Sequence, residues 1–242
     1  MLVFQIFNRK KNQSLKFIAL DSEELTNLLK KHELWLEYGA QKGQQANLIR
    51  ADLRDANIGG ADLYGVNLLE ADLTGAIIKW TNLQTAKLEK AVLEGADLEG
   101  VNLEDAVLSN ANLINVSCWY ANLKRADFHG ANLQQASIQF TDLQGANFSE
   151  ANLENANFLG TDLSNTNFQS ANLHRANLKD ANLNFANLKN SNLQGVNFRG
   201  TNFGNTEANE AILISVAIDR KTMSYLPQKI LKKYKRTFFI VS

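Results

Sequence analysis

Three histidines and one cysteine are the residues of this chain best suited to acid–base or nucleophilic chemistry. A histidine titrates near neutral pH and can transfer protons or bind a metal, and a cysteine thiolate can attack an electrophile. Either chemistry needs several such groups to converge in one pocket. The places that the fold gives to His32, His129, His174 and Cys118 therefore decide whether the chain is an enzyme.

A five-residue repeat sets the elements that position these residues. From Ala46 onward each unit has a small residue, Asn or Asp, then Leu, Ile or Phe, and two variable residues. The central residue is Leu, Ile or Phe in every unit from Leu48 to Phe203 except at Cys118, and Asn or Asp precedes it in 26 of 32 units. Fixed-period self-similarity indicates a solenoid, and a period of five matches neither a helix nor a flat strand. Each unit must therefore contain its own turn.

A longer period gives the number of units in one coil. The central residues at every tenth position from Leu53 to Leu193 are all leucine, whereas the alternate series is mixed. Such a superperiod needs an even number of units per coil, and two units would enclose no interior. We therefore predict an all-β solenoid with four units, or 20 residues, per coil. It would have eight coils over residues 46–205 and an imperfect ninth over 206–223.

The positions within a unit have different expected roles. The central residue and the small residue two places before it point inward, because side chains alternate along an extended segment. The Asn or Asp side chain can bond to nearby backbone N–H groups and fix the turn. Gly ends ten units and Asn six, which suits the positive φ of a type II turn. Phe128, Phe148 and Phe168 fall on one face in successive coils and predict a stack of rings.

The stretch ADLRDANIGGADLYGVNLLEADLTGA resembles the pentapeptide repeat family, and units of this type cover about two-thirds of the chain. The resemblance implies a right-handed quadrilateral β-helix, which agrees with four units per coil. Many members of the family come from cyanobacteria. The resemblance therefore suggests a cyanobacterial-type protein.

The N-terminal end of an open solenoid needs a cover, because unpaired strand edges would polymerise. In residues 1–45 the sequence predicts a β-hairpin and then a capping helix over 22–38. Asp21 or Ser22 would begin this helix, and Gly39 would end it. This block is similar to the leader that precedes the coils in other members of the family.

The C-terminal residues 224–242 predict a second capping helix, which is basic and amphipathic and starts at Pro227. Its apolar side would cover the last coil through Ile230, Leu231, Tyr234 and Phe238. A different interpretation is contact with a membrane surface through residues 228–242, given their five basic side chains.

With 20 residues per coil, the candidate chemical groups do not converge. His129 and His174 fall on different faces two coils apart, and His32 lies in the N-terminal helix. Cys118 occupies an inward position, where a cysteine is an inert core residue. We therefore predict a non-enzymatic protein with no catalytic residues, no metal site and no cofactor.

The composition of the chain indicates which class of partner it can bind and in which cellular compartment it acts. The chain has 25 basic and 25 acidic residues, and the repeat block carries 11 basic and 17 acidic ones. This balance does not favour a nucleic-acid partner. The N-terminus lacks the ordered regions of a signal peptide, and no apolar stretch reaches the roughly 18 residues of a membrane span. We therefore expect a cytoplasmic protein.

One face departs from the regular repeat. Its last positions run Gly60, Trp80, Gly100, Tyr120, Phe140 and Gly160, with Trp119 and Leu159 alongside, and it has Ile77, Ser117 and Ser137 where Asn or Asp is usual. Exposed Trp and Tyr side chains are frequent in binding hot spots. We predict a regulatory scaffold, monomeric or dimeric, that binds an unidentified protein partner through Trp80, Trp119, Tyr120, Phe140 and Leu159. Alternatively, a terminal segment covers these rings.

The family resemblance also implies an alternative function. Some members protect a type II topoisomerase (gyrase) by imitating DNA, and others of this kind would inhibit it. A protein that imitates DNA needs acidic side chains in a row along the rod. The outward glutamates instead encircle one coil, at Glu89, Glu94, Glu99 and Glu104. This arrangement favours the scaffold over the DNA-mimicking inhibitor or protector.

Overall fold

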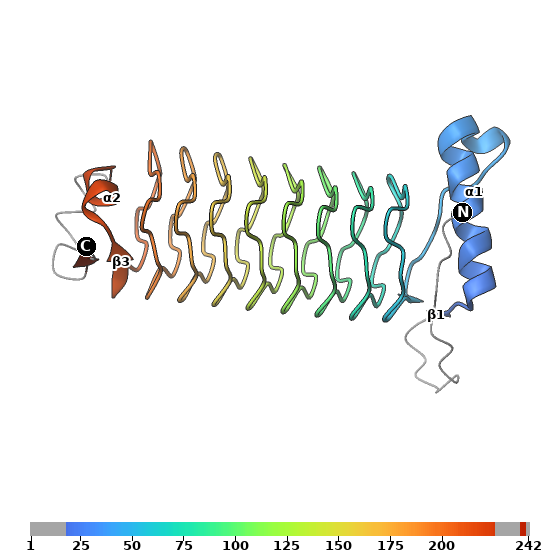
Figure 1. The fold of residues 1–242 in the computed structure, drawn as a ribbon, viewed down its shortest axis with the longest axis horizontal. Helices are drawn as coiled ribbons and strands as arrows, with labels where there is room; N and C mark the ends of the chain where they lie inside the picture. Colours follow the sequence, from blue (N-terminus) through green and yellow to red (C-terminus); the bar gives the residue numbers. More distant parts are fainter. Residues whose placement is uncertain (1–17, 226–237, 241–242) are drawn as a thin grey trace.

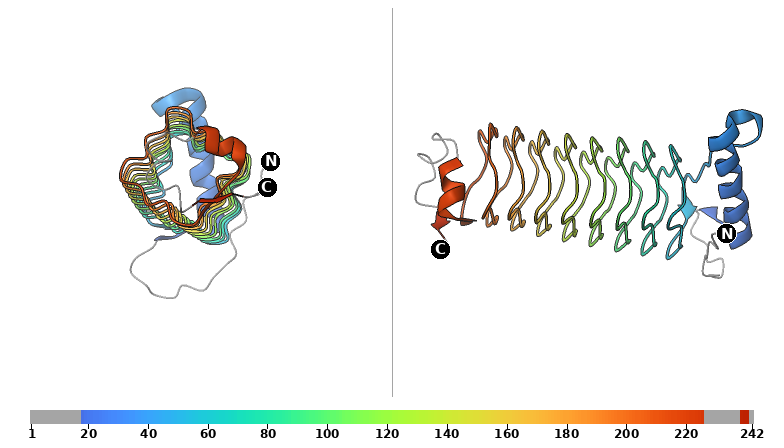
Figure 2. Two further views of the ribbon diagram at one scale, coloured as in Figure 1. Left: turned by 90° about the vertical axis from the view of Figure 1, so that its left-hand side faces the viewer. Right: turned by 45° about the horizontal axis from the view of Figure 1, so that its top comes forward.

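A computed structural model of the 242-residue chain describes residues 18–225 and 238–240. Its body is a rod of stacked coils (Figure 1). Helix α1 (Ser22–Tyr38) crosses one end of the rod, and helix α2 (Arg220–Tyr225) lies at the other. Seen along the rod, the successive coils superpose in one four-cornered outline (Figure 2).

Each coil is 20 residues long, as parallel β-bridges show. They join the second position of a unit to the residue 20 places later, from Asn47 and Asn67 to Asn197 and Ala217. The predicted register of four five-residue units per coil is therefore confirmed. Within the rod itself only β2 (Ala51–Asp52) and β3 (Val216–Ile218) extend beyond single bridges, because a corner follows every third residue.

The backbone N–H groups of a regular unit all have partners. In residues 101–105, the first donates across the corner to Leu98 and the second to Thr81 in the preceding coil. The third and fifth donate to Asn122 and Lys124 in the following coil, and the fourth donates to the side chain of Asn102. The five donor–acceptor distances are between 2.8 and 3.2 Å. The Asn side chain thus satisfies the one donor that the coils leave over.

The corners all use the left-handed backbone region. Every fifth residue from Arg50 to Ser215 has a φ between 53° and 73°. Each regular corner is a type II turn, since its third residue has a positive φ and its fourth N–H returns to the first carbonyl. Twenty-four of these residues are not glycine, so the coil imposes a conformation that L-residues adopt at a cost.

The interior is filled by the central residues and by the small residues two places before them. Phe128, Phe148 and Phe168 are fully buried and stack with their centroids 4.7 and 5.3 Å apart. Threonine replaces alanine at a few inward positions, where its hydroxyl needs a partner. Thr141 Oγ1, for example, donates to the carbonyl of Cys118 in the preceding coil at 2.8 Å.

A ladder of amides runs along one outward side of the coils. We use "Asn ladder" for Asp62, Asn82, Asn102 and Asn122, in which each amide Nδ2 donates to the Oδ1 of the residue one coil earlier. These distances are 2.8, 3.3 and 3.0 Å. The second position of the unit therefore joins neighbouring coils as well as fixing its own turn.

The N-terminal end is covered by α1, which spans the same residues as the helix predicted from the sequence. Asp21 accepts N–H groups of the first turn, Glu24 bonds back to the backbone of Asp21, and the helix ends at Gly39. Strand β1 (Ile18–Ala19) pairs in parallel with β2, and a 3₁₀ turn, η1, follows at Gly39–Gln41. The predicted hairpin falls mainly in residues 1–17, outside the described residues.

The helix predicted over residues 224–242 is wrong at its far end, where Phe238–Ile240 form strand β4 and pair in parallel with β3. Residues 224 and 225 end helix α2, which begins at Arg220. An amphipathic pattern does not show that the last coil has an unpaired edge, and a parallel strand satisfies that edge. Residues 226–237, which include Pro227 and the basic side chains proposed for membrane contact, lie outside the described residues.

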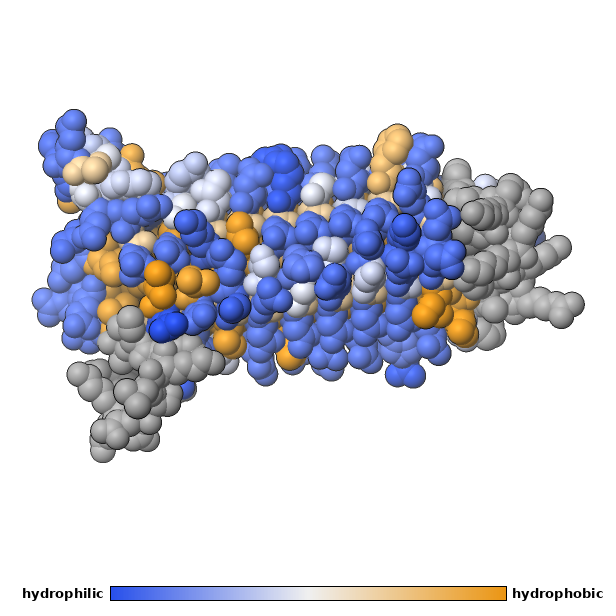
Figure 3. Space-filling view, turned by 180° about the vertical axis from the view of Figure 1, so that it is seen from behind, coloured by the Kyte–Doolittle hydropathy of each residue, from blue (hydrophilic) through white to orange (hydrophobic). Residues whose placement is uncertain are grey.

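The surface seen from behind is mostly hydrophilic, with hydrophobic residues gathered mainly toward the two ends (Figure 3). Among the helices of the described residues, none is long and apolar enough to cross a membrane.

Candidate interaction surface

The histidines and the cysteine lie apart in the structure. His129 Nδ1 lies 3.0 Å from Ser149 Oγ on the rod surface, and His32 is buried in α1. Cys118 is buried, and burial together with the charge of Asp97 raises its pKa to about 12, so the thiol stays protonated at neutral pH. Within residues 18–225 and 238–240, no group of three or more His, Cys, Asp or Glu side chains is placed to hold a metal.

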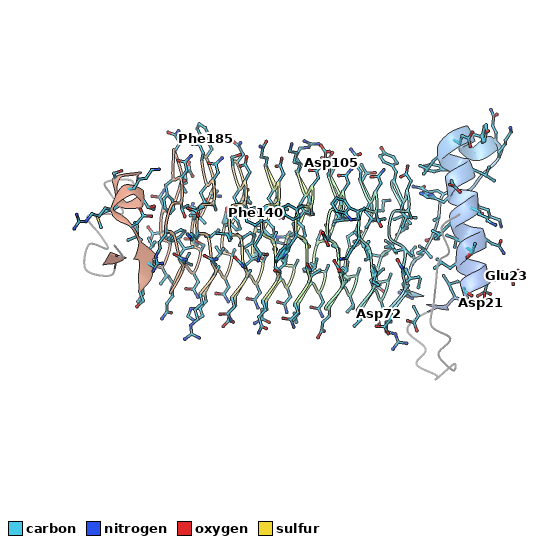
Figure 4. All side chains as sticks on the ribbon, viewed as in Figure 1. Asp21, Glu23, Asp72, Asp105, Phe140 and Phe185 are labelled. Atoms are coloured by element: carbon cyan, nitrogen blue, oxygen red, sulfur yellow. The ribbon has the colours of Figure 1, made fainter. Side chains whose placement is uncertain are left out.

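The rings predicted to share one face do lie together. We use "aromatic edge" for Trp80, Trp119, Tyr120 and Phe140, whose exposed fractions are between 41% and 63%. Leu159, the fifth predicted residue, is half-buried beside them. Figure 4 shows Phe140 midway along the rod, and Phe185, another exposed corner residue, near its upper margin.

Contacts between the rings fix their orientation. Tyr120 and Phe140 stack with centroids 5.7 Å apart and planes 14° apart, and Trp119 meets Tyr120 edge-on at 6.5 Å. The Phe140 ring lies over the corner of the next coil, where a Cβ on Gly160 would come within 2.9 Å of it. Trp80 covers Gly100 in the same way. Because Gly100 and Gly160 have no side chain, the rings of Trp80 and Phe140 have room to lie along the rod.

A hydrogen-bonded chain holds Trp119. Its Nε1 donates to Ser137 Oγ at 2.8 Å, and Ser137 Oγ donates to Oε1 of the buried Gln139 at 2.7 Å. Ser137 stands where the repeat usually has Asn, so the break in the repeat is what gives the indole its acceptor. Sequence reasoning noted this departure but did not assign a role to Ser137 or Gln139. The sequence signal that could have revealed this hydrogen bond is a serine in the coil that follows an outward tryptophan.

Charged side chains flank the aromatic edge in compact groups. Lys79 Nζ lies 2.8 Å from Glu99 and 2.9 Å from Asp97, and these hydrogen bonds raise the pKa of Lys79. On the neighbouring side of the coils, Arg125 bonds to Asp105 at 2.7 Å and also to Glu104. Cations thus neutralise part of the acidic belt formed by the outward glutamates.

Comparison with known sequences identifies the family of the chain. The sequence profile of the Pentapeptide repeats family matches in eight copies, over residues 44–68, 51–89, 86–117, 111–149, 146–184 and 176–214. The chain belongs to the pentapeptide repeat family. Members fold as right-handed quadrilateral β-helices, as the four-cornered coils of this pentapeptide repeat protein do.

Several solved structures are similar to this pentapeptide repeat protein. HetL from the cyanobacterium Nostoc sp. strain PCC 7120, described as involved in heterocyst differentiation regulation, is 31% identical over 72% of this chain and 83% of HetL, with a TM-score of 0.39. The protein alr5209 from Nostoc is 32% identical over 48% of this chain and 84% of its own, with a TM-score of 0.28.

A trypsin-treated form of QnrB1, described as a plasmid-mediated fluoroquinolone resistance protein, is 17% identical over 76% of this chain and 92% of its own. Its TM-score of 0.64 shows a shared fold. Among curated proteins, no sequence matches the chain.

Proposed function

We propose that this pentapeptide repeat protein is a non-enzymatic scaffold that binds a protein partner through the aromatic edge. The observation that carries the proposal is that Trp119, Tyr120 and Phe140 are exposed and yet held in place by ring contacts and by Ser137. Fixed aromatic side chains lose little freedom on binding, and they supply large contact areas.

The backbone of the edge supports a role beyond stability. Trp80, Tyr120 and Phe140 have φ values of 56° or 57°, in a region that bulky residues rarely adopt. Glycine fills other corners of the same column, so the coil itself does not require a ring there. A ring at these corners adds backbone strain that glycine would avoid, and this supports a role for the rings themselves.

A regulatory role is the form of this function that we favour. HetL, at 31% identity, is described as involved in the regulation of heterocyst differentiation. Regulation by a scaffold without catalytic groups requires contact with another protein, and the aromatic edge offers the surface for it. We place this activity in the cytoplasm.

Protection or inhibition of gyrase by imitation of DNA is the other function to test. Such a mimic needs a row of unneutralised acidic groups along the rod. Here Arg125 bonds to Glu104 and Asp105, and Lys79 bonds to Asp97 and Glu99, which supports the scaffold instead. We expect a large molar excess of the protein to leave gyrase supercoiling unchanged. Inhibition, or rescue of supercoiling from a gyrase poison, would favour the DNA mimic.

A capture experiment tests the aromatic edge. The triple variant Trp119→Ser, Tyr120→Ser and Phe140→Ser should lose the proteins that the wild type captures from a lysate of its source organism. Phe185→Ser is the matched control, because Phe185 is an exposed aromatic residue at a different corner. Circular dichroism should show an unchanged β-helix in both variants. Undiminished capture by the triple variant would show that the edge is not the binding surface.

A further inference from the structure

We propose that a second copy of this chain binds along the aromatic edge, side by side and antiparallel, about a two-fold axis at Phe140. The inference rests on the proposed function in that the same rings form the surface, and it names the partner. In an isologous interface the same patch serves both copies, so the patch must be complementary to itself when it is reversed. The outward columns of this face meet that requirement.

Reversal of the rod about Phe140 gives definite pairs of residues. A corner that lies a given number of coils before Phe140 in one copy would face the corner that lies the same number of coils after Phe140 in the other copy. Phe140 faces its own copy, Tyr120 faces Gly160, and Trp119 faces Leu159. The stacked rings of Tyr120 and Phe140 in one copy would thus meet the same rings of the other, with glycine rather than a second bulky residue opposite Tyr120.

The charges on this face are also complementary when the rod is reversed. Two coils before Gln139 lies Glu99, which forms a group of net charge −1 with Asp97 and with Lys79 of the preceding coil. Two coils after Gln139 lies Lys179, next to Asp180 at 3.8 Å and one coil before Arg199, and these three side chains carry a net charge of +1. Glu99 and Lys179 occupy the same column, so the antiparallel pair places them opposite each other twice. One coil further out, Lys79 faces Arg199, but the ammonium of Lys79 is already paired with Asp97 and Glu99.

The length of the strip sets the expected strength of the pair. Six coil spacings separate Trp80 from Gly200, which is about 29 Å at the usual strand spacing of about 4.8 Å. One edge of a narrow rod buries less than the roughly 800 Å² per partner of a standard interface. We therefore expect a weak dimer that forms with rising concentration. Since the dimer covers the rings, it would compete with any other protein for the aromatic edge.

Sedimentation of the purified protein alone is the first test. The wild type should pass from monomer to dimer as its concentration rises toward roughly 100 µM, the range of a weak pair. Phe140→Asp places two carboxylates at the two-fold axis and should leave the chain monomeric. Phe185→Asp, at another exposed corner, should behave as the wild type does. A wild type that stays monomeric, or a dimer that Phe140→Asp does not affect, would overturn the proposal.

A charge exchange tests the antiparallel register. Glu99→Lys and Lys179→Glu each put like charges opposite each other in a homodimer, so each variant alone should dimerise at least tenfold more weakly. Mixed together they should form a heterodimer if the rods lie antiparallel, because the introduced lysine then faces the introduced glutamate and the native Lys179 of one variant faces the native Glu99 of the other. Circular dichroism must show that both variants are folded. The double variant Glu99→Lys with Lys179→Glu restores opposite charges at both contacts of an antiparallel pair, and it should dimerise as the wild type does. Failure of the double variant to associate would contradict this register.

Cross-linking locates the two-fold axis. The native Cys118 is buried and protonated, so an added cysteine reports alone. Phe140→Cys should form a disulfide-linked dimer under mild oxidation, whereas Phe185→Cys should stay monomeric. Equal cross-linking of both variants would mean random collision and would count against the pair. Lys179→Glu leaves the rings intact, so partner capture by this variant tests the proposed function separately from self-association.

Discussion

Two stacks of aromatic rings run along this rod, one inside and one outside. Phe128, Phe148 and Phe168 stack in the interior with planes 6° apart, and Tyr120 and Phe140 stack on the surface with planes 14° apart. Both arise from the same repeat, because a 20-residue coil brings equivalent residues into neighbouring levels. The central position of a unit is buried and the last position is a corner. A ring at the central position of a unit therefore stabilises the rod, whereas a ring at the last position is exposed and available for binding.

The backbone makes the same distinction. Phe140 has a φ of 56°, in the left-handed region, whereas Phe148 lies in the extended part of its unit. A left-handed conformation costs an L-residue about 1–2 kcal/mol, which its ring contacts only partly offset. The interior stack therefore stabilises the rod, whereas the exterior stack adds no net stability to it.

The largest expected effect comes from the interior stack. Phe148→Ala removes a fully buried ring that contacts Phe128, Phe158 and Phe168 and leaves a cavity between coils. The free energy of unfolding should fall by about 3–5 kcal/mol. Denaturant unfolding followed by circular dichroism measures it. A loss below about 1 kcal/mol would mean that the interior stack carries no more stability than the exterior one.

A smaller loss is expected from the Asn ladder, which lies beside the aromatic edge on the same coils. Asn122→Ala removes hydrogen bonds to Asn102 and Glu104, at 3.0 and 3.1 Å, and the acceptor for the N–H of Lys124. We expect a loss of about 1–2 kcal/mol by the same measurement. Ser117→Ala, at the equivalent position of the preceding unit, should change stability by less than about 0.5 kcal/mol. Equal losses would show that the two sides hold the coils together alike.

The regular part of the fold could be predicted because its cause is local. The spacing of Leu53 to Leu193 fixes the coil length, and a repeated corner fixes the positive φ. Strand β4 could not be predicted in this way. Phe238 to Ile240 are a short apolar run, which fits a helix as well as a strand, and only their pairing with β3 shows that they are extended.

The aromatic edge was predictable in position but not in detail. Counting by 20 places Trp80, Tyr120 and Phe140 in one column, since the register is uniform. The stack of Tyr120 on Phe140, and the separate position of Trp80 over Gly100, depend on which neighbouring corners lack a side chain. The hydrogen bonds that join Trp119 to Ser137 and Ser137 to Gln139 depend on side-chain torsions, which no sequence spacing specifies.

The exterior stack itself should be nearly neutral for stability. Phe140→Gly relieves the left-handed strain but loses the ring contacts and gains freedom in the unfolded chain, so the free energy of unfolding should change by less than about 1 kcal/mol. Partner capture and self-association should nevertheless be lost. A destabilisation like that of Phe148→Ala would remove the distinction between the two stacks.

A third pair of stacked rings, His32 and Trp35 on α1 with centroids 5.5 Å apart, extends the comparison to the dependence of stability on pH. His32 Nδ1 accepts the N–H of Ala46 at 3.0 Å, so the buried ring is neutral. Burial lowers its pKa below the ordinary value of 6.5, although Asp62 and the backbone of Tyr64 act in the opposite direction.

The unfolded chain therefore binds the His32 proton first as pH falls below 6.5. The stabilisation is complete above that pH, and it should decline toward the lowered pKa of the folded protein. His32→Asn keeps an acceptor for Ala46 without titrating in this range, and should show a flatter dependence than the wild type between pH 7 and about 5, above the usual carboxylate range. Parallel curves for the two proteins would mean that folding does not change the pKa of His32. The interior stack has no titratable ring, so Phe148→Ala should lower both ends of the wild-type curve equally.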